Sequence, residues 1–406
     1  MERIVVIGAG QAASSLMVKL RSSGFEGGIR LIGDEPHLPY QRPPLSKKYL
    51  AGEMPQERLL LRQEAWYEKC RIDVTLGRPA LRIDRQAQRV ELSEGDAVAY
   101  DRLVLTTGAR PRRLPAAIGG DLPDVFMMRD LADADALAAA MRPGRKVLVI
   151  GGGYIGLEAA AEAAKKGLEV TLIEAAERLL QRVAAKETAD YFRTLHSARG
   201  VTIREGAGIE RLSPEDGGGL AAVLADGTSL AADLAVVGIG ILPNSELAAE
   251  AGLDLVHGAI RVDAFGRTSD PSIFAAGDCA AVTWNDRPIR LESVQNAQDQ
   301  AVNVALNILG DAQPYRPEPW FWSDQYDVKL QIAGLNAGYD QVVVRPGAKE
   351  SAAHFYYQGE TLLAVDAMND PVAYNVTKRL LTAGRPLPKA LAADPAADLK
   401  AFLAGA

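Results

Sequence analysis

The residues best suited by type and spacing to do chemistry lie in two glycine-rich segments. The first is Gly8-Ala9-Gly10-Gln11-Ala12-Ala13, and the second is Gly151-Gly152-Gly153-Tyr154-Ile155-Gly156. Glycines at this spacing permit a tight turn and let the backbone approach a pyrophosphate, whose charge a helix N-terminus favours. One such turn also occurs for purely structural reasons. Two copies in one chain predict two dinucleotide sites.

An acidic residue follows each glycine segment at a similar distance. Asp34 and Glu35 close the first unit, and Glu174 closes the second. A carboxylate there can bind the ribose hydroxyls of a dinucleotide, so all three are candidate cofactor ligands. At Glu174 it would also repel the extra phosphate of NADPH, which predicts a preference for NADH. Arg178, four residues later, could weaken that preference.

Each glycine segment requires a strand before it and a helix and a strand after it. In the first unit, apolar runs at Arg3 to Ile7 and Ile29 to Ile32 flank a helix-like stretch, on which Ala13 is small enough for close packing. In the second unit the pattern predicts strands over 145–150 and 168–173 and a helix over 157–166. Two complete units favour FAD in one and a nicotinamide cofactor in the other, so that a hydride can pass between them.

The rest of the chain alternates strands, helices and loops. The proline-rich segment from Pro36 to Lys48 predicts a rigid loop without regular structure. The last twenty residues predict a peripheral helix or a frayed tail. The other predicted strands are 72–76, 81–84, 89–92, 101–105, 234–238, 328–333, 341–345 and 361–365, and the other predicted helices are 130–141, 186–199, 293–309 and 372–382.

Composition narrows the classes of protein. With 406 residues, 48% of them hydrophobic, the chain can form two or three domains. A net charge of -7 argues against nucleic acid or an anionic membrane as a partner. No signal peptide or membrane span is visible, and the two cysteines fit a reducing compartment, so we predict a cytoplasmic protein. We expect it to be a monomer or weak dimer. No metal site is predicted.

Longer motifs carry a resemblance to a known family. Thr106-Thr107-Gly108-Ala109 and Ile273-Phe274-Ala275-Ala276-Gly277-Asp278, together with both glycine units, resemble the two-dinucleotide flavoprotein reductases. Pro-Tyr-Gln-Arg-Pro-Pro-Leu-Ser-Lys at 39–47, Gly-Gly-Gly-Tyr-Ile-Gly-Leu-Glu at 151–158 and Pro-Trp-Phe-Trp-Ser-Asp-Gln at 319–325 are similar to the NADH-dependent ferredoxin reductases. Those enzymes supply electrons to haem-thiolate monooxygenases and ring-hydroxylating dioxygenases.

The resemblance implies an α/β fold with two Rossmann-like domains, arranged as in glutathione reductase. An FAD domain, predicted at 1–113 and 238–316, would be interrupted by an NADH domain at 114–237 and followed by a small α+β domain at 317–406. By resemblance, Ala80 takes a backbone contact on the adenine side and Trp322 lies near the isoalloxazine. The FAD contacts implied are Gly8, Gly10, Ala12, Asp34, Lys47, Arg129, Asp278 and Val294.

Two further side chains are candidates for the chemistry. Lys47 could lie beside the flavin and pair with Glu158, which would make this pair catalytic, or both could be exposed surface charges. Tyr154, in the second glycine turn, could cover the nicotinamide pocket or belong to the core. Asp278 could accept hydrogen bonds from the ribityl chain or cap a helix.

The cysteines point to the electron acceptor. Cys70 and Cys279 form no close redox pair in sequence, so electrons would leave the flavin directly and singly toward a partner that docks near it. The family resemblance implies that this partner is a 2Fe-2S ferredoxin. Such carriers are usually acidic, and Arg287, Arg290, Lys329 and Arg379 are candidate docking residues, or simply solvated charges. Two alternatives stay open: an NADH-dependent flavoprotein that reduces a small acceptor such as a quinone, and a signalling flavoprotein like the apoptosis-inducing factors.

Overall fold

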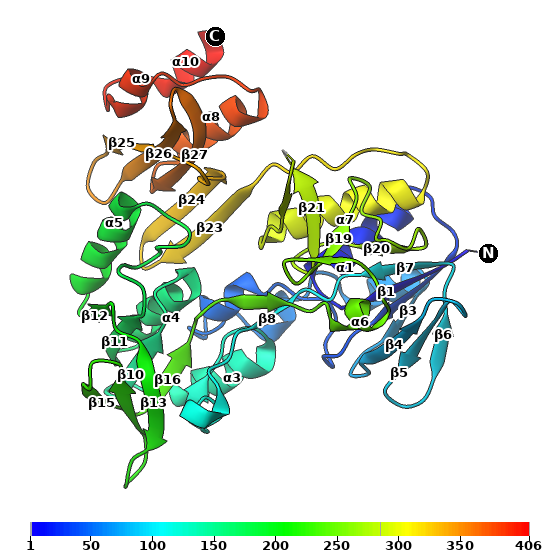
Figure 1. Cartoon of the computed structure of the whole chain (residues 1–406), viewed down its shortest axis with the longest axis horizontal. Coiled ribbons are helices and arrows are strands. Elements are labelled where there is room, and N and C mark those ends of the chain that lie inside the picture. The colour runs from blue at the N-terminus through cyan, green and yellow to red at the C-terminus, as the bar shows by residue number, and fades with distance from the viewer. Residues whose placement is uncertain (1, 285, 406) are drawn as a thin grey trace. The chain divides into compact units, whose positions relative to one another are not determined.

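The computed structural model describes residues 2–284 and 286–405, and the chain divides into two compact units (Figure 1). The first unit comprises Met1–Arg42, Pro55–Arg110 and Ile241–Pro319. The second comprises Pro43–Met54, Pro111–Gly240 and Trp320–Ala406. The domain boundaries predicted from the sequence stay a prediction.

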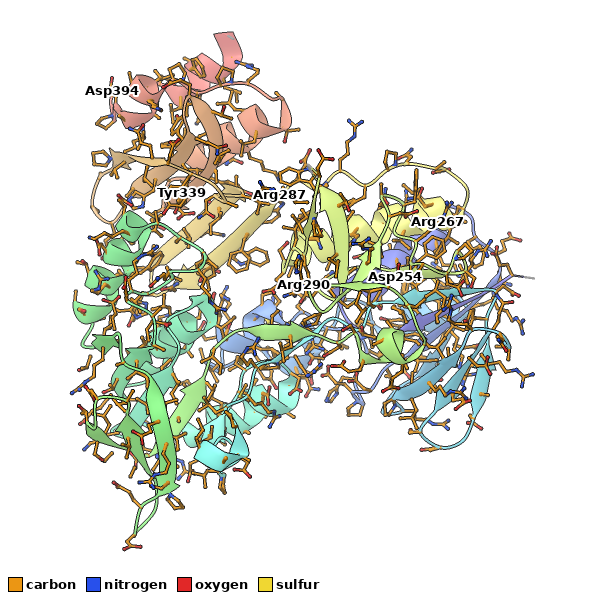
Figure 2. The ribbon with its side chains drawn as sticks, in the orientation of Figure 1. Asp254, Arg267, Arg287, Arg290, Tyr339 and Asp394 are labelled. Carbon is orange, nitrogen blue, oxygen red and sulfur yellow. The ribbon has the colours of Figure 1, made fainter. Side chains whose placement is uncertain are left out.

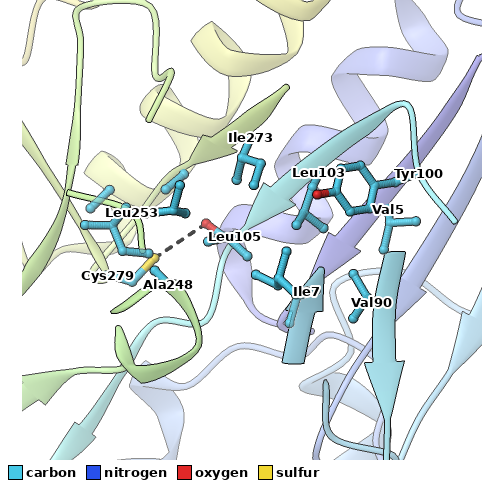
Figure 3. Packing of buried hydrophobic residues seen from close by; sticks show 14 of the residues in the cluster. Val5, Ile7, Val90, Tyr100, Leu103, Leu105, Ala248, Leu253, Ile273 and Cys279 are labelled. Atoms are coloured by element: carbon cyan, nitrogen blue, oxygen red, sulfur yellow. Dashed lines mark hydrogen bonds between the residues drawn. The ribbon is translucent and has the colours of Figure 1, made fainter. Parts of the chain in front are cut away.

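A parallel five-stranded sheet, in the order β20-β7-β1-β2-β3, forms the centre of the first unit. Successive residues of a strand point to opposite faces of the sheet. Ile4 and Val6 therefore pack with residues of α1 and α7, whereas Val5 and Ile7 pack in the core shown in Figure 3. In that second core, the Cys279 thiol donates to the Leu105 carbonyl oxygen over 3.5 Å (Figure 3).

The first unit also contains smaller antiparallel sheets and short helices. Its elements are β1 Arg3–Ile7, α1 Gln11–Ser22, β2 Gly28–Ile32, η2 Gln56–Arg58, α2 Glu64–Lys69, β3 Ile72–Thr75, β4 Ala80–Asp84, β5 Arg89–Leu92, β6 Ala97–Ala99, β7 Arg102–Leu105, β8 Ala109–Pro111 (whose last residue belongs to the second unit), β17 Ile241–Pro243, α6 Glu246–Glu250, β18 Leu255–Val256, β19 Ala259–Val262, β20 Ile273–Ala275, β21 Ala280–Trp284, β22 Arg287–Ile289 and α7 Val294–Ile308.

The second unit contains two five-stranded sheets. One is parallel, with the order β12-β11-β10-β16-β9, and the other is antiparallel, with the order β23-β24-β27-β26-β25. Its elements are η1 Pro43–Ser46, η3 Ala116–Ile118, β9 Val125–Phe126, α3 Leu131–Ala140, β10 Lys146–Ile150, α4 Tyr154–Lys165, β11 Glu169–Glu174, α5 Lys186–Ser197, β12 Thr202–Glu205, β13 Ile209–Pro214, β14 Leu220–Leu224, β15 Ser229–Ala232, β16 Leu234–Val237, β23 Trp320–Gln325, β24 Val328–Gly334, β25 Gln341–Pro346, β26 Ala352–Gln358, β27 Thr361–Met368, α8 Pro371–Thr382, α9 Lys389–Ala393 and α10 Leu399–Gly405.

The predicted α/β fold class with two parallel, Rossmann-like sheets is confirmed. Several local predictions are wrong. The proline-rich segment contains the 3-10 turn η1, because Pro43 and Pro44 have the backbone angle that such a turn requires. Helix α4 begins at Tyr154 and not at Leu157, because Gly153 acts as its N-cap. Strands β23 and β26 have no counterpart among the predicted elements.

None of the helices within residues 2–284 and 286–405 combines the length and the apolar character that crossing a membrane requires. In the same residues, no group of three or more His, Cys, Asp or Glu side chains could hold a metal ion.

Candidate functional site

The first glycine turn joins β1 to α1 and combines one tightly enclosed glycine with one open glycine. Gly8 has a φ of 102°, and a Cβ there would lie 2.3 Å from the Thr106 carbonyl oxygen. Gly10 is the N-cap of α1, and among the described residues no side chain caps this helix. A Cβ built at Gly10 would meet no described atom within 4 Å. The turn therefore leaves free space directly in front of a helix N-terminus, as an anionic pyrophosphate requires.

The second glycine turn, between β10 and α4, repeats this arrangement. Gly151 has a φ of 110°, and a Cβ there would lie 2.5 Å from the Gly238 carbonyl oxygen. Gly153 is open in the same sense as Gly10, and no described side chain caps α4. A Cβ at Gly156 would lie 2.0 Å from the Gly151 carbonyl oxygen, so only glycine fits there. Both turns fit a dinucleotide.

Other predicted FAD residues of the first unit lie next to the first turn. A Cβ at Gly277 would lie 3.3 Å from that of Ala12, so the residue before Asp278 is next to α1. Asp278 is partly exposed, and its carbonyl oxygen accepts from Arg290. Val294 is the first residue of α7, whose N-cap Ser293 accepts from the Asn296 N–H. Ala13 is fully buried in the α1 core.

The two acidic residues after β2 differ in what they can offer a cofactor. Asp34 is exposed and accepts from the Glu35 N–H over 3.0 Å. The Glu35 carboxylate is already engaged, because it accepts from the Tyr40 hydroxyl over 2.5 Å and pairs with the Arg42 guanidinium. Asp34 is therefore the more available ribose ligand, although Glu35 was predicted alongside it.

Two implied FAD residues lie apart from the glycine turn in the chain. Ala80 is the first residue of β4 and pairs with Leu92 of β5. Arg129 lies just before α3 in the second unit, and its N–H donates to the Asp133 carboxylate over 2.9 Å.

Glu174 ends β11 beside the second turn, as the sequence predicts for a ribose ligand. Its carboxylate accepts from the N–H groups of Gly152, over 2.7 Å, and Ala176, over 2.8 Å. These bonds fix the carboxylate at the turn. The Arg178 guanidinium, which could weaken a preference for NADH, donates to the carbonyl oxygens of Leu179, Gln181 and Ala184. These bonds occupy it.

The second unit brings Lys47 and Glu158 together. The Lys47 Nζ lies 2.6 Å from Glu158 Oε2, and the Glu158 side chain is only 2% exposed. The ammonium also donates to the Ser46 hydroxyl over 3.3 Å and to the Pro43 carbonyl oxygen over 3.4 Å. The interpretation of these residues as two exposed surface charges is thereby wrong. Their catalytic role stays a prediction.

Aromatic side chains surround the start of α4. The Tyr154 ring lies 5.0 Å from that of Phe321 on β23, and the Phe321 ring is 6.4 Å from that of Trp322. The buried Tyr154 hydroxyl has no hydrogen-bond partner among the described residues, and burial raises its pKa well above the usual value. Ile155, next along the helix, is 41% exposed. The exposed Ile155 leaves apolar surface beside the second glycine turn, which a cofactor could cover.

Two hydroxyl groups that the sequence analysis missed also contact Glu158. Ser46 Oγ donates to Glu158 Oε2 over 2.6 Å, and Ser323 Oγ donates to Oε1 over 2.7 Å. Both serines lie inside motifs on which the family resemblance rests. The signal was therefore present, but single serines have no spacing that marks them as ligands.

Family models match almost the whole chain. A model described as "Pyridine nucleotide-disulphide oxidoreductase" matches residues 2–301, and one described as "Reductase C-terminal" matches residues 320–403.

Individual proteins match over nearly their full lengths. Rhodocoxin reductase from Rhodococcus erythropolis is 45% identical, covering 99% of this chain and 94% of its own. The ferredoxin-NAD(+) reductase component of the anthranilate 1,2-dioxygenase system from Burkholderia cepacia is 42% identical, covering 98% of each chain. The reductase in the crystal structure of the covalent putidaredoxin reductase-putidaredoxin complex has a TM-score of 0.95 at 42% identity, covering 100% of this chain and 99% of that one.

Proposed function

Because the chain belongs to the pyridine nucleotide-disulphide oxidoreductase family, we propose that it is an FAD-dependent NADH:ferredoxin oxidoreductase. It passes electrons from NADH, one at a time, to a 2Fe-2S ferredoxin. That ferredoxin serves a haem-thiolate monooxygenase or a ring-hydroxylating dioxygenase. The relative from the anthranilate 1,2-dioxygenase system and the structure of putidaredoxin reductase in complex with putidaredoxin support this function.

The observation that carries the proposal is the pair of open glycines, Gly10 and Gly153, each the N-cap of a twelve-residue helix that no described side chain caps. Each position can accept a pyrophosphate, so one chain can hold two dinucleotides. In this assignment the first turn, with Asp34, Asp278 and Val294, holds FAD. The second turn, with Glu174, holds NADH.

When bound, FAD would supply the chemistry that converts one hydride from NADH into two single electrons. The protein supplies binding, orientation and charge. Lys47, held by Glu158, would place a positive charge beside the flavin, where electron density would increase on reduction. Tyr154, whose ring packs against that of Phe321, would cover the nicotinamide site and exclude water until the cofactor displaces it.

The cysteines support direct transfer from flavin to ferredoxin. Cys70 and Cys279 are both free, and Cys279 is fully buried in the core of the first unit. Burial raises the pKa of the Cys279 thiol, which makes the reactive thiolate scarce. Cys279 is therefore poorly suited to a sulfur relay, and in this proposal the electrons pass without one.

Ferredoxin docking is proposed to use four cations, of which Arg287, Lys329 and Arg379 are exposed and Arg290 is half-buried. Arg287 is the first residue of β22 and Arg290 directly follows that strand; both are labelled in Figure 2. Arg290 also pairs with Glu292 over 2.5 Å. Lys329 on β24 and Arg379 on α8 are exposed. An acidic partner would be attracted by such side chains, and its association would then weaken with salt. We place the enzyme, as a monomer or weak dimer, in the cytoplasm, where NADH is available.

Steady-state NADH oxidation, measured with and without a purified 2Fe-2S ferredoxin, tests the proposed function. Strong stimulation by the ferredoxin is expected. Equal rates with a quinone and no response to ferredoxin would instead identify a small-acceptor reductase. Slow reduction with a persistent charge-transfer band would identify a signalling flavoprotein.

A further inference from the structure

Behind Glu158, a line of buried polar side chains extends through the second unit. Ser323 Oγ, which donates to Glu158 Oε1, lies 3.2 Å from Gln325 Nε2. Gln325 Oε1 lies 2.8 Å from His196 Nε2. Ser323, Gln325 and His196 are each 0% exposed. Buried polar groups are costly unless they are paired, so such a line requires a physical reason.

The charge of Glu158 fixes the direction of every hydrogen bond in this line. A carboxylate paired with an ammonium only accepts, so the Ser323 hydroxyl must donate its one proton to Glu158. Ser323 Oγ then accepts from the Gln325 amide nitrogen, which turns the Gln325 carbonyl oxygen toward His196. His196 must therefore carry its proton on Nε2, and its Nδ1 faces the Tyr326 hydroxyl over 3.4 Å.

The environment of His196 agrees with this assignment. Burial lowers the pKa of His196 to about 4, so the ring is neutral near pH 7 and has one donor and one acceptor nitrogen. Each donor along the line consequently points toward Glu158. The line is an oriented set of dipoles that ends on one carboxylate oxygen.

Four segments of the second unit build this arrangement. Ser323 and Gln325 are alternate residues of β23 and share one face of the strand. His196 comes from α5, Glu158 from α4, and Ser46 and Lys47 from η1 and the residue after it. The two carboxylate oxygens are held separately, since Ser46 and Lys47 contact Oε2 whereas Ser323 contacts Oε1.

We propose that Ser323, oriented by Gln325 and His196, is a positioning residue that fixes the Glu158 carboxylate and, through it, the Lys47 ammonium. The inference rests on the proposed function, because the position of that ammonium matters to a flavin. Without the Ser323 hydroxyl, Oε1 loses its donor and the carboxylate can rotate. The Lys47 charge then moves, and the reduced flavin is less well stabilised.

Ser323→Ala removes the hydroxyl, and Ser323→Thr restores it. Two properties are measured: the rate of anaerobic flavin reduction by NADH in a single turnover, and the midpoint potential of the bound FAD by equilibrium titration. Loss of a hydrogen bond to a charged group predicts a rate about 10-fold lower for Ser323→Ala. A tenfold change in the ratio of reduced to oxidised flavin lowers the potential by about 30 mV. Ser323→Thr is expected to restore both properties to within about 2-fold of wild type.

Ser197→Ala is the matched control, because Ser197 is an exposed serine beside His196 on α5. It should leave both properties unchanged. If Ser323→Ala does not fold, Gln325→Met keeps the hydroxyl and removes the amide behind it, and a smaller change in the same direction is expected. Wild-type values in Ser323→Ala, or in Gln325→Met if that replaces it, would overturn the inference.

The outcome can be separated from failure of the proposed function. A wild-type protein that takes up no FAD, or whose FAD is not reduced by NADH, contradicts the proposed function itself. If the wild-type protein is reduced normally and the flavin of Ser323→Ala has the same midpoint potential, only the role of Ser323 is contradicted.

Discussion

At the scale of single residues, Glu158 shows how a buried charge is tolerated. Its carboxylate receives one ammonium and two hydroxyl donors, from Lys47, Ser46 and Ser323. Buried ion pairs need such additional donors, because desolvation otherwise offsets the Coulomb attraction. The sequence predicted the charged pair from family motifs. It could not predict Gln325 or His196, since contacts among four separate segments leave no common spacing in the chain.

Glu174 gives a prediction about the choice of cofactor. Glu174→Arg removes the carboxylate at the ribose position and adds a cation that can pair with the extra phosphate of NADPH. We expect the ratio of kcat/KM for NADH to that for NADPH to fall by about 100-fold, the equivalent of roughly 3 kcal/mol. Flavin reduction rates at a series of cofactor concentrations give this ratio.

Glu177→Arg is the matched control, because Glu177 is an exposed glutamate on the same loop. It should keep the wild-type ratio. An unchanged preference in Glu174→Arg would remove Glu174 from the NADH site.

At the scale of elements, the two glycines of the first turn have different roles: Gly8 is needed for folding and Gly10 for cofactor binding. Gly8 requires a left-handed φ and has the Thr106 carbonyl oxygen against it, whereas Gly10 meets open space. Gly8→Ala is therefore expected to destabilise the protein by about 2 kcal/mol or more. Gly10→Ala should fold normally but lose FAD, because its methyl group occupies the space for the pyrophosphate. Urea unfolding and the flavin absorbance of the purified variants distinguish the two effects.

Gly24→Ala is a useful comparison for this pair, since Gly24 has a φ of 85° without close neighbours among the described residues. It should cost some stability and keep its FAD. A yellow, fully loaded Gly10→Ala would contradict the assignment of the first turn to FAD.

Helix α5 makes stability depend on pH through His196. The pKa of His196 is about 4 in the folded protein, against a usual 6.5. Between pH 4 and pH 6.5 the unfolded chain therefore binds a proton that the folded protein does not. Stability is therefore lost as the pH falls from about 6.5 toward 4. His196→Gln should reduce the change in the free energy of unfolding with pH by up to about 1.4 kcal/mol per pH unit.

Urea unfolding at a series of pH values measures this slope. Asp366, whose pKa burial raises to about 6, acts in the opposite direction but contributes equally to both proteins. The difference between wild type and His196→Gln thus isolates His196. Thr194→Ala, at an exposed position of the same helix, should keep the wild-type slope. A variant slope equal to that of wild type would show that His196 titrates normally.

Local sequence patterns predicted elements well where a repeated unit determined them. Strands β1, β2, β10 and β11 lie within one residue of their predicted positions, since the glycine turns fix their ends. Strand β23 was missed because its buried positions Ser323 and Gln325 are polar, which reverses the usual alternation. Ser323 contacts the Glu158 carboxylate, and Gln325 contacts Ser323 and His196, so neither packs in an apolar core.

At the scale of the whole molecule, each compact unit contains a parallel five-stranded sheet in which one strand, β1 or β10, leads into an open glycine turn and a helix. This repetition is what allows one chain to hold an electron donor and an electron carrier. The sequence predicted the repetition, because two copies of a motif are visible without a structure. The grouping of Trp320–Ala406 with Pro111–Gly240 in one unit was not predictable, since it depends on contacts between distant segments.

The central claim is that electrons from one NADH leave the protein singly for an iron-sulfur partner. Enzyme reduced with one equivalent of NADH under anaerobic conditions is mixed rapidly with excess 2Fe-2S ferredoxin, and the reduced ferredoxin is counted by its absorbance. The account predicts two reduced ferredoxins per flavin, formed in successive one-electron steps. Fully reduced flavin that persists beside oxidised ferredoxin would contradict it.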